Sequence, residues 1–501
     1  MFEVAELGHK ISKSDYNEKV PELRTQLLML QQAMAQENFS VIVLISGVDG
    51  GGKGEVINRL NEWLDPRFMR TNAYATPSDE ERERPEFWRF WRTMPEKGTI
   101  GLYVGSWYSE PIAQHVFKQT NEEQFQKKLK HINQLEQELA ADGTLVIKCW
   151  LHLSKKQQQK RLKQLEANEE TAWQVTERDK KHLKMYDRFV EVAEQVLQTT
   201  SGAQNSWLII EGSDSRYSSL TVGQYLLDKI SHHRESLQKN AVKPALNYQA
   251  TTYYGSQPNI LDSLDLTQCL DKKSYNEQLN YYQGKLNKLA RQAHEKKISS
   301  VLVFEGWDAG GKGGAIRRLT HALDARNYQV IPIAAPTDEE RRQHYLWRFW
   351  RHMPRAGRVT IYDRSWYGRT LVERVEGFAS EDEWMRAYAE INHFEEALHE
   401  HDIVLLKFWL HIDAEEQLKR FKEREQISYK KHKITEEDYR NREQWDAYQL
   451  AVNDMVARTS TRDASWTLVE ANDKRYARIK VLQSYCEQLE KALDTHQAAD
   501  K

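Results

Sequence analysis

The feature that most constrains this sequence is that it is written twice. A glycine-rich stretch containing Gly-Lys-Gly occurs at Gly47–Gly54 and again at Gly306–Gly314, and Lys53 and Lys312 within them are 259 positions apart. The same spacing aligns further motifs, which are Tyr16–Glu18 with Tyr275–Glu277, Trp88–Arg92 with Trp347–Arg351, Ser106–Tyr108 with Ser365–Tyr367, Trp150–His152 with Trp409–His411, and Trp207 with Trp466. A register kept over so long a span predicts a tandem duplication of one domain.

Each copy alternates short apolar runs with segments of helical periodicity. The first copy has an apolar run at 41–45. In the second copy the pattern predicts a helix over residues 275–296 and strands over 298–303, 329–333, 358–362, 403–410 and 466–470. Such alternation predicts an α/β fold, in which each copy is an α/β/α domain with a parallel sheet flanked by helices. Sheets of this kind bind ligands at the carboxyl ends of their strands.

The chain of 501 residues is long enough for two domains of ordinary size. The copies predict domains over residues 1–234 and 265–501. Residues 235–264 lack periodicity and contain turn formers such as Pro244 and Pro258, so they are interpreted as a linker.

Composition restricts the classes of function. The net charge of −2 argues against a protein-wide nucleic-acid-binding face, so an anion site must be a local cluster of lysine and arginine. The cysteines Cys149, Cys269 and Cys486 are too scattered for a metal knuckle or a disulfide framework. Neither a signal peptide nor a membrane span is visible. We therefore expect a reduced, cytoplasmic protein with neither nucleic acid nor membrane as a partner.

The stretch Gly306–Gly314 has the context of a phosphate-binding loop. It follows an apolar strand and precedes a helical run that begins at Ala315. Glycines allow backbone N–H groups to close on phosphate oxygens, Lys312 supplies positive charge, and the helix N-terminus adds a partial positive charge. The alternative is a glycine-rich turn with a surface lysine, and the flanking strand and helix disfavour it.

One position of this loop is unusual. The residue after Lys312, commonly a serine or threonine whose hydroxyl holds Mg²⁺, is Gly313. A carboxylate inside a phosphate loop would repel phosphate unless a cation lay between them. Asp308 is therefore predicted to be a metal ligand.

A second acidic and basic pair follows the third predicted strand. Asp363 and Arg364 lie at its carboxyl end, where an aspartate can hold a metal opposite a phosphate loop and an arginine can neutralise phosphoryl oxygens. A surface salt bridge is the alternative, which the neighbouring phosphate loop disfavours.

Two basic segments allow two readings each. Arginines surround Trp347 and Trp350, whose helical spacing favours a place in the core over a platform for stacking bases. The run from Lys419 through Lys433 is either a solvated helical face or an arginine-bearing lid that closes over phosphates, with Arg420 and Arg424 as its strongest candidates.

With these motifs in place, the chain resembles the polyphosphate kinase 2 family, in particular its fused two-domain class. The matching motifs are Gly306–Gly314, Tyr362–Tyr367, Val372–Val375 and Glu470–Lys474. The resemblance implies a P-loop-kinase fold like that of thymidylate kinase, with a helical lid. It also implies inorganic polyphosphate as donor, Mg²⁺ as cofactor and a nucleotide as acceptor, for which the class suggests AMP.

The resemblance also assigns roles by position. It implies that Asp308 and Asp363 hold Mg²⁺, that Lys312 and Arg364 grip the transferring phosphoryl group, that Arg424 closes from the lid, and that Glu373 lies near the reacting groups. It further implies a set of substrate-binding residues, namely Gly306, Gly310, Gly311, Gly313, Gly314, Arg326, Arg369 and Arg420.

The first copy departs from this pattern. At the positions equivalent to Asp363, Arg364, Arg369, Glu373 and Arg424 it has Val104, Gly105, Glu110, Gln114 and Leu165, although it keeps Asp49, Lys53 and Arg67. Loss of both charge-neutralising groups predicts that the first copy does not catalyse. Weak polyphosphate binding and a purely packing role are both left open for it.

The favoured reaction is transfer from polyphosphate to AMP without a phosphoenzyme, since no histidine or serine in the motifs is placed as an acceptor. An ATP-dependent nucleoside monophosphate kinase is one alternative, which Gly313 disfavours. A polyphosphate-binding regulatory protein is another, which the intact second copy disfavours. Oligomeric state is left open, and a homo-oligomer is possible.

Overall fold

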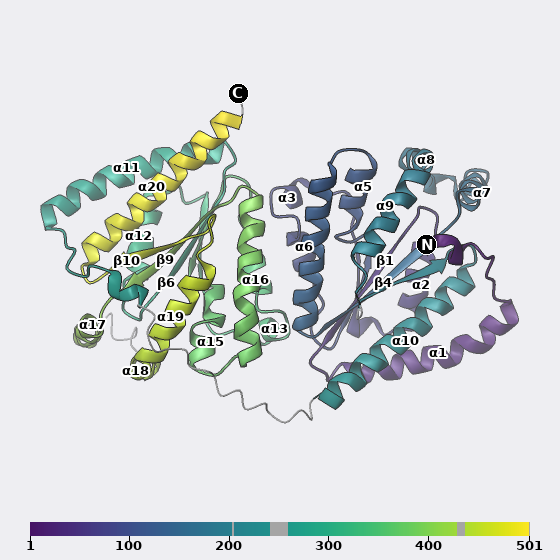
Figure 1. Cartoon of the computed structure of the whole chain (residues 1–501), viewed down its shortest axis with the longest axis horizontal. Helices are drawn as coiled ribbons and strands as arrows, with labels where there is room; N and C mark the ends of the chain where they lie inside the picture. Colours follow the sequence, from purple (N-terminus) through teal and green to yellow (C-terminus); the bar gives the residue numbers. More distant parts are fainter. Residues whose placement is uncertain (203–204, 241–258, 428–435, 500–501) are drawn as a thin grey trace. The chain divides into compact units, whose positions relative to one another are not determined.

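The computed structural model describes residues 1–202, 205–240, 259–427 and 436–499 (Figure 1). Among these residues the chain forms two compact units. The first contains Met1–Pro77, the chain from Phe90 to the end of the first repeat, and Asp338–His344. The second contains the remainder, including Ser78–Arg89, so each repeat lends a short segment to the other unit.

Each unit has one five-stranded parallel sheet. The first sheet has the order β2-β3-β1-β4-β5, and the second has the same order in its own strands, β7-β8-β6-β9-β10. The strands of the first sheet are β1 Ser40–Gly47, β2 Met69–Ala73, β3 Ile100–Val104, β4 Thr144–His152 and β5 Trp207–Glu211. Those of the second are β6 Ser300–Gly306, β7 Tyr328–Pro332, β8 Val359–Asp363, β9 Val404–His411 and β10 Trp466–Glu470. The predicted duplication, sheet type and strands are confirmed.

Helices cover both faces of each sheet (Figure 1). The first repeat has α1 Lys13–Met34, α2 Lys53–Trp63, α3 Asp79–Arg82 (in the segment lent to the second unit), α4 Trp88–Trp91, α5 Ser109–Val116, α6 Glu122–Ala141, α7 Lys155–Glu166, α8 Glu177–Lys184, α9 Tyr186–Thr199 and α10 Ser215–Asn240. The second repeat has α11 Lys272–Glu295, α12 Lys312–Ala322, α13 Asp338–Arg341, α14 Trp347–Trp350, α15 Val372–Val375, α16 Glu381–Glu400, α17 Ala414–Gln426, α18 Glu436–Glu443, α19 Trp445–Thr459 and α20 Lys474–Ala499.

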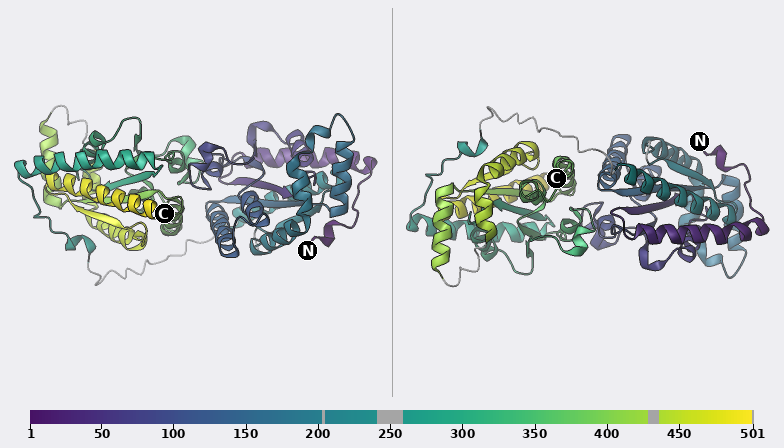
Figure 2. Two further views of the ribbon diagram at one scale, coloured as in Figure 1. Left: turned by 90° about the horizontal axis from the view of Figure 1, so that it is seen from above. Right: turned by 90° about the horizontal axis from the view of Figure 1, so that it is seen from below.

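In the second unit α11 and α20 lie side by side with α12 on one face of the sheet (Figures 1 and 2). On the opposite face α16 packs against β9 and α19. The central strand β6 is therefore covered on both sides, and Val301, Leu302, Val303 and Phe304 are fully buried. A strand without a solvent face reads as a continuous apolar run, which is why the sequence pattern identified it.

A buried ion pair is repeated in the two units. In the second, Lys407 of β9 donates to Glu395 of α16 at 2.7 Å and to the Tyr367 hydroxyl at 2.9 Å. Trp366 and Tyr367 donate to the other oxygen of the same carboxylate. In the first unit Lys148, Glu136, Trp107 and Tyr108 make the same contacts. The Ser-Trp-Tyr motif common to the repeats therefore supports the fold.

Two sequence interpretations can be compared directly with the fold. Trp347 and Trp350 lie in a single turn, α14, and both are buried, with the Trp350 ring edge-on to Phe394, so their assignment to the core is confirmed. The helix α10 continues to Asn240, within the predicted linker over 235–264, whose bounds stay a prediction. The central residues of that linker, 241–258, lie outside the described part of the chain. None of the described helices is long and apolar enough to span a membrane.

Candidate active site

The glycine-rich loop of the second unit lies at the carboxyl end of β6, in the centre of the sheet. The chain passes from β6 to β7 and β8 on one side and later to β9 and β10 on the other, which makes this the switch point of the topology. At Gly306 (φ +146°) a Cβ atom would come within 2.5 Å of the Leu410 carbonyl, so only glycine fits. At Gly313 a Cβ would meet nothing within 4 Å. Gly313 therefore leaves open space beside the first turn of α12, which begins earlier than predicted, at Lys312.

Lys312 folds back over its own loop. Its Nζ donates to the carbonyl oxygens of Gly306 at 2.6 Å and Trp307 at 3.3 Å. Burial lowers the pKa of Lys312, and the negative charges of Asp308 and Asp363 oppose that shift. Lys53 makes the equivalent contacts with Gly47 and Val48 in the first unit.

Asp308 is held from two directions. Its Oδ1 accepts a hydrogen bond from Arg364 at 3.1 Å, and its Oδ2 accepts one from Asn441 of α18 at 3.0 Å. Burial works to raise the pKa of Asp308, but the charges of Lys312 and Arg364 outweigh it and the net shift is downward. Asp308 is therefore kept as a carboxylate, the form in which it can bind a cation.

Asp363 is the last residue of β8, the immediate neighbour of β6, and Arg364 follows it. Arg364 has a left-handed backbone (φ +66°), and its N–H donates to the Phe304 carbonyl. A left-handed conformation strains a residue that carries a side chain. The equivalent Gly105 has nearly the same conformation (φ +72°) without that strain. The second repeat thus keeps a strained arginine where glycine would suffice for the turn, which indicates that the side chain is needed.

The predicted residues converge on one pocket of about 360 Å³. Its lining includes Asp308, Lys312, Asp363, Arg364, Arg424 and the glycines Gly310, Gly311, Gly313 and Gly314. These side chains come from the β6–α12 loop, the end of β8 and α17. Two carboxylates and four cations, with Arg317 of α12 as the fourth, thus face one cavity beside a helix N-terminus, which suits phosphate groups accompanied by a metal ion.

Arg369 and Glu373 lie beyond this pocket and pair with each other. Arg369 Nε is 3.1 Å from Glu373 Oε2, and its guanidinium lies 4.6 Å from the centre of the Tyr345 ring. Burial raises the pKa of Glu373, and the charges of Arg369 and Arg348 oppose it. The predicted roles of Arg369 and Glu373 remain predictions.

Arg420 lies behind the loop. Its Nη1 donates to Ala309 and Gly310 carbonyls, its Nη2 to Ala471 and Asn472 carbonyls, and its Nε to Glu416. With only 2% of its surface exposed, this guanidinium ties the loop to the start of α20. Such an arrangement fits indirect support of a substrate, through the loop, better than the predicted direct contact.

Arg326 is not brought to the site. It lies between α12, which begins at the loop and leads away from it, and the start of β7. It is therefore at the amino ends of the strands, whereas the loop is at their carboxyl ends. It forms a double hydrogen bond with Asp324, at 3.0 and 2.6 Å, and is 86% exposed. Arg67 and Asp65 form the same pair in the first unit. In both repeats the arginine fixes a turn, and the substrate-binding role of Arg326 stays a prediction.

The structure also adds residues that sequence reasoning missed. Glu305, the residue before Gly306, is 5% exposed and its Oε1 accepts a hydrogen bond from Ser365 at 2.8 Å. Burial raises its pKa, and the charges of Lys312 and Arg364 oppose the shift. Its equivalent in the first repeat is Ser46. The sequence signal that could have identified Glu305 is this difference between the repeats, in which an acid replaces a serine directly before the loop.

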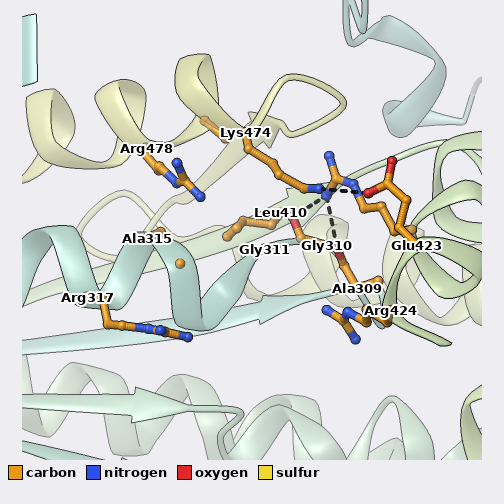
Figure 3. A pocket seen from close by; sticks show the side chains of 13 residues that line it. Ala309, Gly310, Gly311, Ala315, Arg317, Leu410, Glu423, Arg424, Lys474 and Arg478 are labelled. Carbon is orange, nitrogen blue, oxygen red and sulfur yellow. Dashed lines mark hydrogen bonds and ion pairs between the residues drawn. The ribbon is translucent and has the colours of Figure 1, made fainter. Parts of the chain in front are cut away.

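A basic groove of about 210 Å³ continues from the loop (Figure 3). We define it by four cations: Arg317 of α12, Arg424 of α17, and Lys474 and Arg478 of α20. At the equivalent positions the first repeat has Asn58, Leu165, Ser215 and Ser219. All four of these positive charges are therefore restricted to the second repeat. Once the groove residues are known, aligning the repeats by 259 positions reveals this difference.

The equivalent loop of the first unit is covered by its own side chains. His182 Nδ1 lies 2.6 Å from Asp49 Oδ2, and Lys53 Nζ lies 3.8 Å from Asp49 Oδ1. Glu55, which stands where the second repeat has Gly314, pairs with Arg161. A carboxylate thus lies near the N-terminus of α2, where a phosphate loop would receive its anion.

The donor atoms of the second unit fit a hard divalent cation. Asp308 and Asp363 are carboxylates at the ends of neighbouring strands, and both face the same cavity. Oxygen ligands are those that Mg²⁺ and similar ions prefer. The first unit keeps Asp49 alone, because Val104 replaces the second carboxylate.

Comparison with known proteins gives a consistent result. The family model Polyphosphate kinase 2 matches residues 10–238 and again 269–497. A protein named polyphosphate:AMP phosphotransferase from Pseudomonas aeruginosa is 50% identical, covering 98% of this chain and 99% of the relative. One of the same name from Acinetobacter johnsonii is 39% identical over 91% and 92% of the two chains. A crystal structure from Pseudomonas aeruginosa assigned to polyphosphate kinase 2 superposes with a TM-score of 0.86 at 48% identity and covers both chains completely.

Proposed function

The chain belongs to the polyphosphate kinase 2 family, and we propose that it transfers the terminal phosphoryl group of inorganic polyphosphate to AMP, giving ADP. The observation that carries this proposal is the convergence of a phosphate loop, two carboxylates and Arg364 on one cavity of the second unit. Relatives named for the same reaction, similar over their full length, support the choice of donor and acceptor.

The site residues divide the work of transfer. Lys312 and Arg364 are placed to neutralise the oxygens of the phosphoryl group, and Arg424 adds a third positive charge from α17. Asp308 and Asp363 would hold Mg²⁺, which when bound supplies further charge neutralisation. No histidine or serine among the described cavity-lining residues is available as a covalent acceptor, so we assign a direct in-line transfer. Positioning and charge neutralisation suffice for such a step.

The basic groove gives the donor chain a path away from the reacting end. Each internal phosphate of a polyphosphate carries negative charge, and Arg317, Arg424, Lys474 and Arg478 provide cations along the groove. Arg369 and Glu373 line neither this groove nor the cavity of the loop, and we propose that they contact AMP.

The first repeat, which we assign to residues 1–234, does not catalyse in this proposal. It lacks the second carboxylate, the arginine after it and the four groove cations. Its loop carries Glu55 paired with Arg161 instead. The catalytic repeat is assigned to residues 265–501, and the cytoplasm is proposed as the place of action.

The reaction can be tested with purified protein, Mg²⁺ and long-chain polyphosphate in the absence of ATP. A panel containing AMP, GMP and ADP is incubated separately, and the products are separated by charge. Rapid formation of ADP from AMP is expected. Formation of ADP only after addition of ATP would instead identify an ordinary nucleoside monophosphate kinase, and absence of any product would favour a polyphosphate-binding protein.

A further inference from the structure

In each repeat a short helix contributes one side chain to the aspartate of the glycine-rich loop. In the second repeat this is Asn441 of α18, whose Nδ2 donates to Asp308 Oδ2 at 3.0 Å. In the first it is His182 of α8, at the position 259 residues earlier, with Nδ1 at 2.6 Å from Asp49 Oδ2. The contact is common to both repeats, but its chemistry is not.

The two side chains have opposite effects on a carboxylate that should bind a cation. The amide of Asn441 donates one hydrogen bond without positive charge, so it orients Asp308 and leaves its negative charge available. The His182 imidazole instead lies against Asp49 Oδ2 and occupies the oxygen at which a metal ion would otherwise bind.

Asn441 is itself held in place. Trp445, one helical turn further along the chain, stacks on Trp307 of the loop with ring centroids 3.7 Å apart and planes 5° apart. The Tyr448 hydroxyl lies 3.5 Å from Asn441 Oδ1. The beginning of α19 is thus fixed to the residue next to Asp308, and the amide has little freedom to turn away.

We propose that Asn441 is a positioning residue that orients Asp308 for a divalent cation, and that His182 withdraws Asp49 from the same task in the first repeat. The proposal rests on the metal-binding role proposed above for Asp308. Groups that hydrogen-bond to a metal-ligating carboxylate fix its orientation, and their loss commonly weakens metal binding 10–100-fold.

The test measures metal binding directly, with Mn²⁺ as the probe and the full chain without substrates. Bound Mn²⁺ is obtained from the loss of the electron paramagnetic resonance signal of the free ion. Asn441→Ala is expected to weaken Mn²⁺ binding about tenfold. Because alanine favours a helix, the variant should fold, which circular dichroism and thermal unfolding can check.

Asn441→His places the first-repeat residue in the second repeat. Its imidazole should occupy Asp308 Oδ2 as the His182 imidazole occupies Asp49 Oδ2, so Mn²⁺ binding should be weaker than in the wild type. If either Asn441→Ala or Asn441→His binds Mn²⁺ like the wild type, the proposal is overturned.

Asp308→Asn separates this inference from the proposed function. If that variant binds Mn²⁺ as tightly as the wild type, Asp308 is not a metal ligand and the proposed metal site itself fails. If Asp308→Asn loses Mn²⁺ binding while both Asn441 variants retain it, only the role of Asn441 is refuted.

Discussion

In both repeats a buried lysine joins a glutamate and a tyrosine, Lys148 in the first and Lys407 in the second. By contrast, strand β8 of the second repeat ends with Asp363 and is followed by Arg364. The equivalent positions of the first repeat are Val104 and Gly105. Two classes of motif residue therefore separate within one chain. The lysine network kept by both repeats holds the sheet and its helices together, whereas the aspartate and arginine kept by one repeat face the cavity.

The comparison of the two repeats also indicates how a phosphate-binding loop can lose the ability to bind phosphate. The first repeat retains Lys53, Asp49 and four of the five loop glycines, with Glu55 in place of the fifth. The charged residues that it has lost lie mainly on neighbouring elements. The residues that it has gained pair locally, Glu55 with Arg161 and His182 with Asp49. The loop motif alone therefore says little about whether a repeat can catalyse.

The largest expected effect is the loss of catalysis when the second repeat is given the residue of the first. Asp363→Val should lower kcat by at least about 10³-fold, because one of the two carboxylates that hold the metal is removed. The measurement is ADP formation from AMP and polyphosphate. Lys312→Ala and Lys53→Ala form the matched control pair, of which only the first should abolish transfer. Complete loss in a correctly folded Lys53→Ala variant would refute an inactive first repeat.

The next largest expected effect is a loss of stability, and it should be equal in the two repeats. Lys407→Met and Lys148→Met each leave a fully buried glutamate without its cation, which should cost about 3–5 kcal/mol of the free energy of unfolding of the affected unit. Both lysines are fully buried, so solvent cannot compensate. Urea unfolding followed by tryptophan fluorescence gives the two values. A large cost in one repeat alone would show that the network is not a shared support of the fold.

Acid should affect the repeats differently through His411 and its equivalent His152. Burial lowers the pKa of His411 to about 4, from 6.5. Between these values the unfolded chain binds a proton that the folded chain does not, so the free energy of unfolding falls as the pH is lowered, by up to about 3 kcal/mol at the end of the interval. The stabilisation is fully present above pH 6.5.

His411→Gln tests this, because glutamine offers an acceptor to the Trp307 indole, now 3.0 Å from His411 Nδ1, but does not titrate. Unfolding free energies at pH 7 and pH 4.5 should differ less in the variant than in the wild type. Burial also lowers the pKa of His152, but its hydrogen bond with Glu6 opposes the shift. His152→Gln should therefore remove a smaller part of the acid sensitivity, and equal effects would contradict this difference.

The smallest effect is expected from single cations of the basic groove. Arg317→Asn, Lys474→Ser and Arg478→Ser each introduce the first-repeat residue and should raise the KM for polyphosphate about tenfold, with little change in kcat, because one charged contact to the donor is lost. The reciprocal Ser219→Arg should leave KM unchanged. A fall in kcat at constant KM would place these cations in the chemistry rather than along the donor chain.

The sequence was sufficient for the architecture and for the centre of the site. Buried parallel strands read as apolar runs, and loop glycines, Asp308 and Asp363 follow those runs directly, so their convergence could be predicted. Arg420 could not be interpreted correctly, because a charge run does not reveal which of its side chains is buried among carbonyl groups. Asn441 gave no signal at all, since its contact with Asp308 joins segments 133 residues apart.

The left-handed backbone of Arg364 has a consequence for how such a duplicated enzyme can decay. Replacing Arg364 by glycine would relieve about 1 kcal/mol of conformational strain, and the greater freedom of glycine in the unfolded chain would offset a similar amount. The lost ion pair with Asp308 involves a half-exposed guanidinium and contributes little to folding. Stability therefore offers no resistance to this substitution. A repeat released from selection for catalysis can acquire the glycine found at position 105 without passing through a poorly folded intermediate.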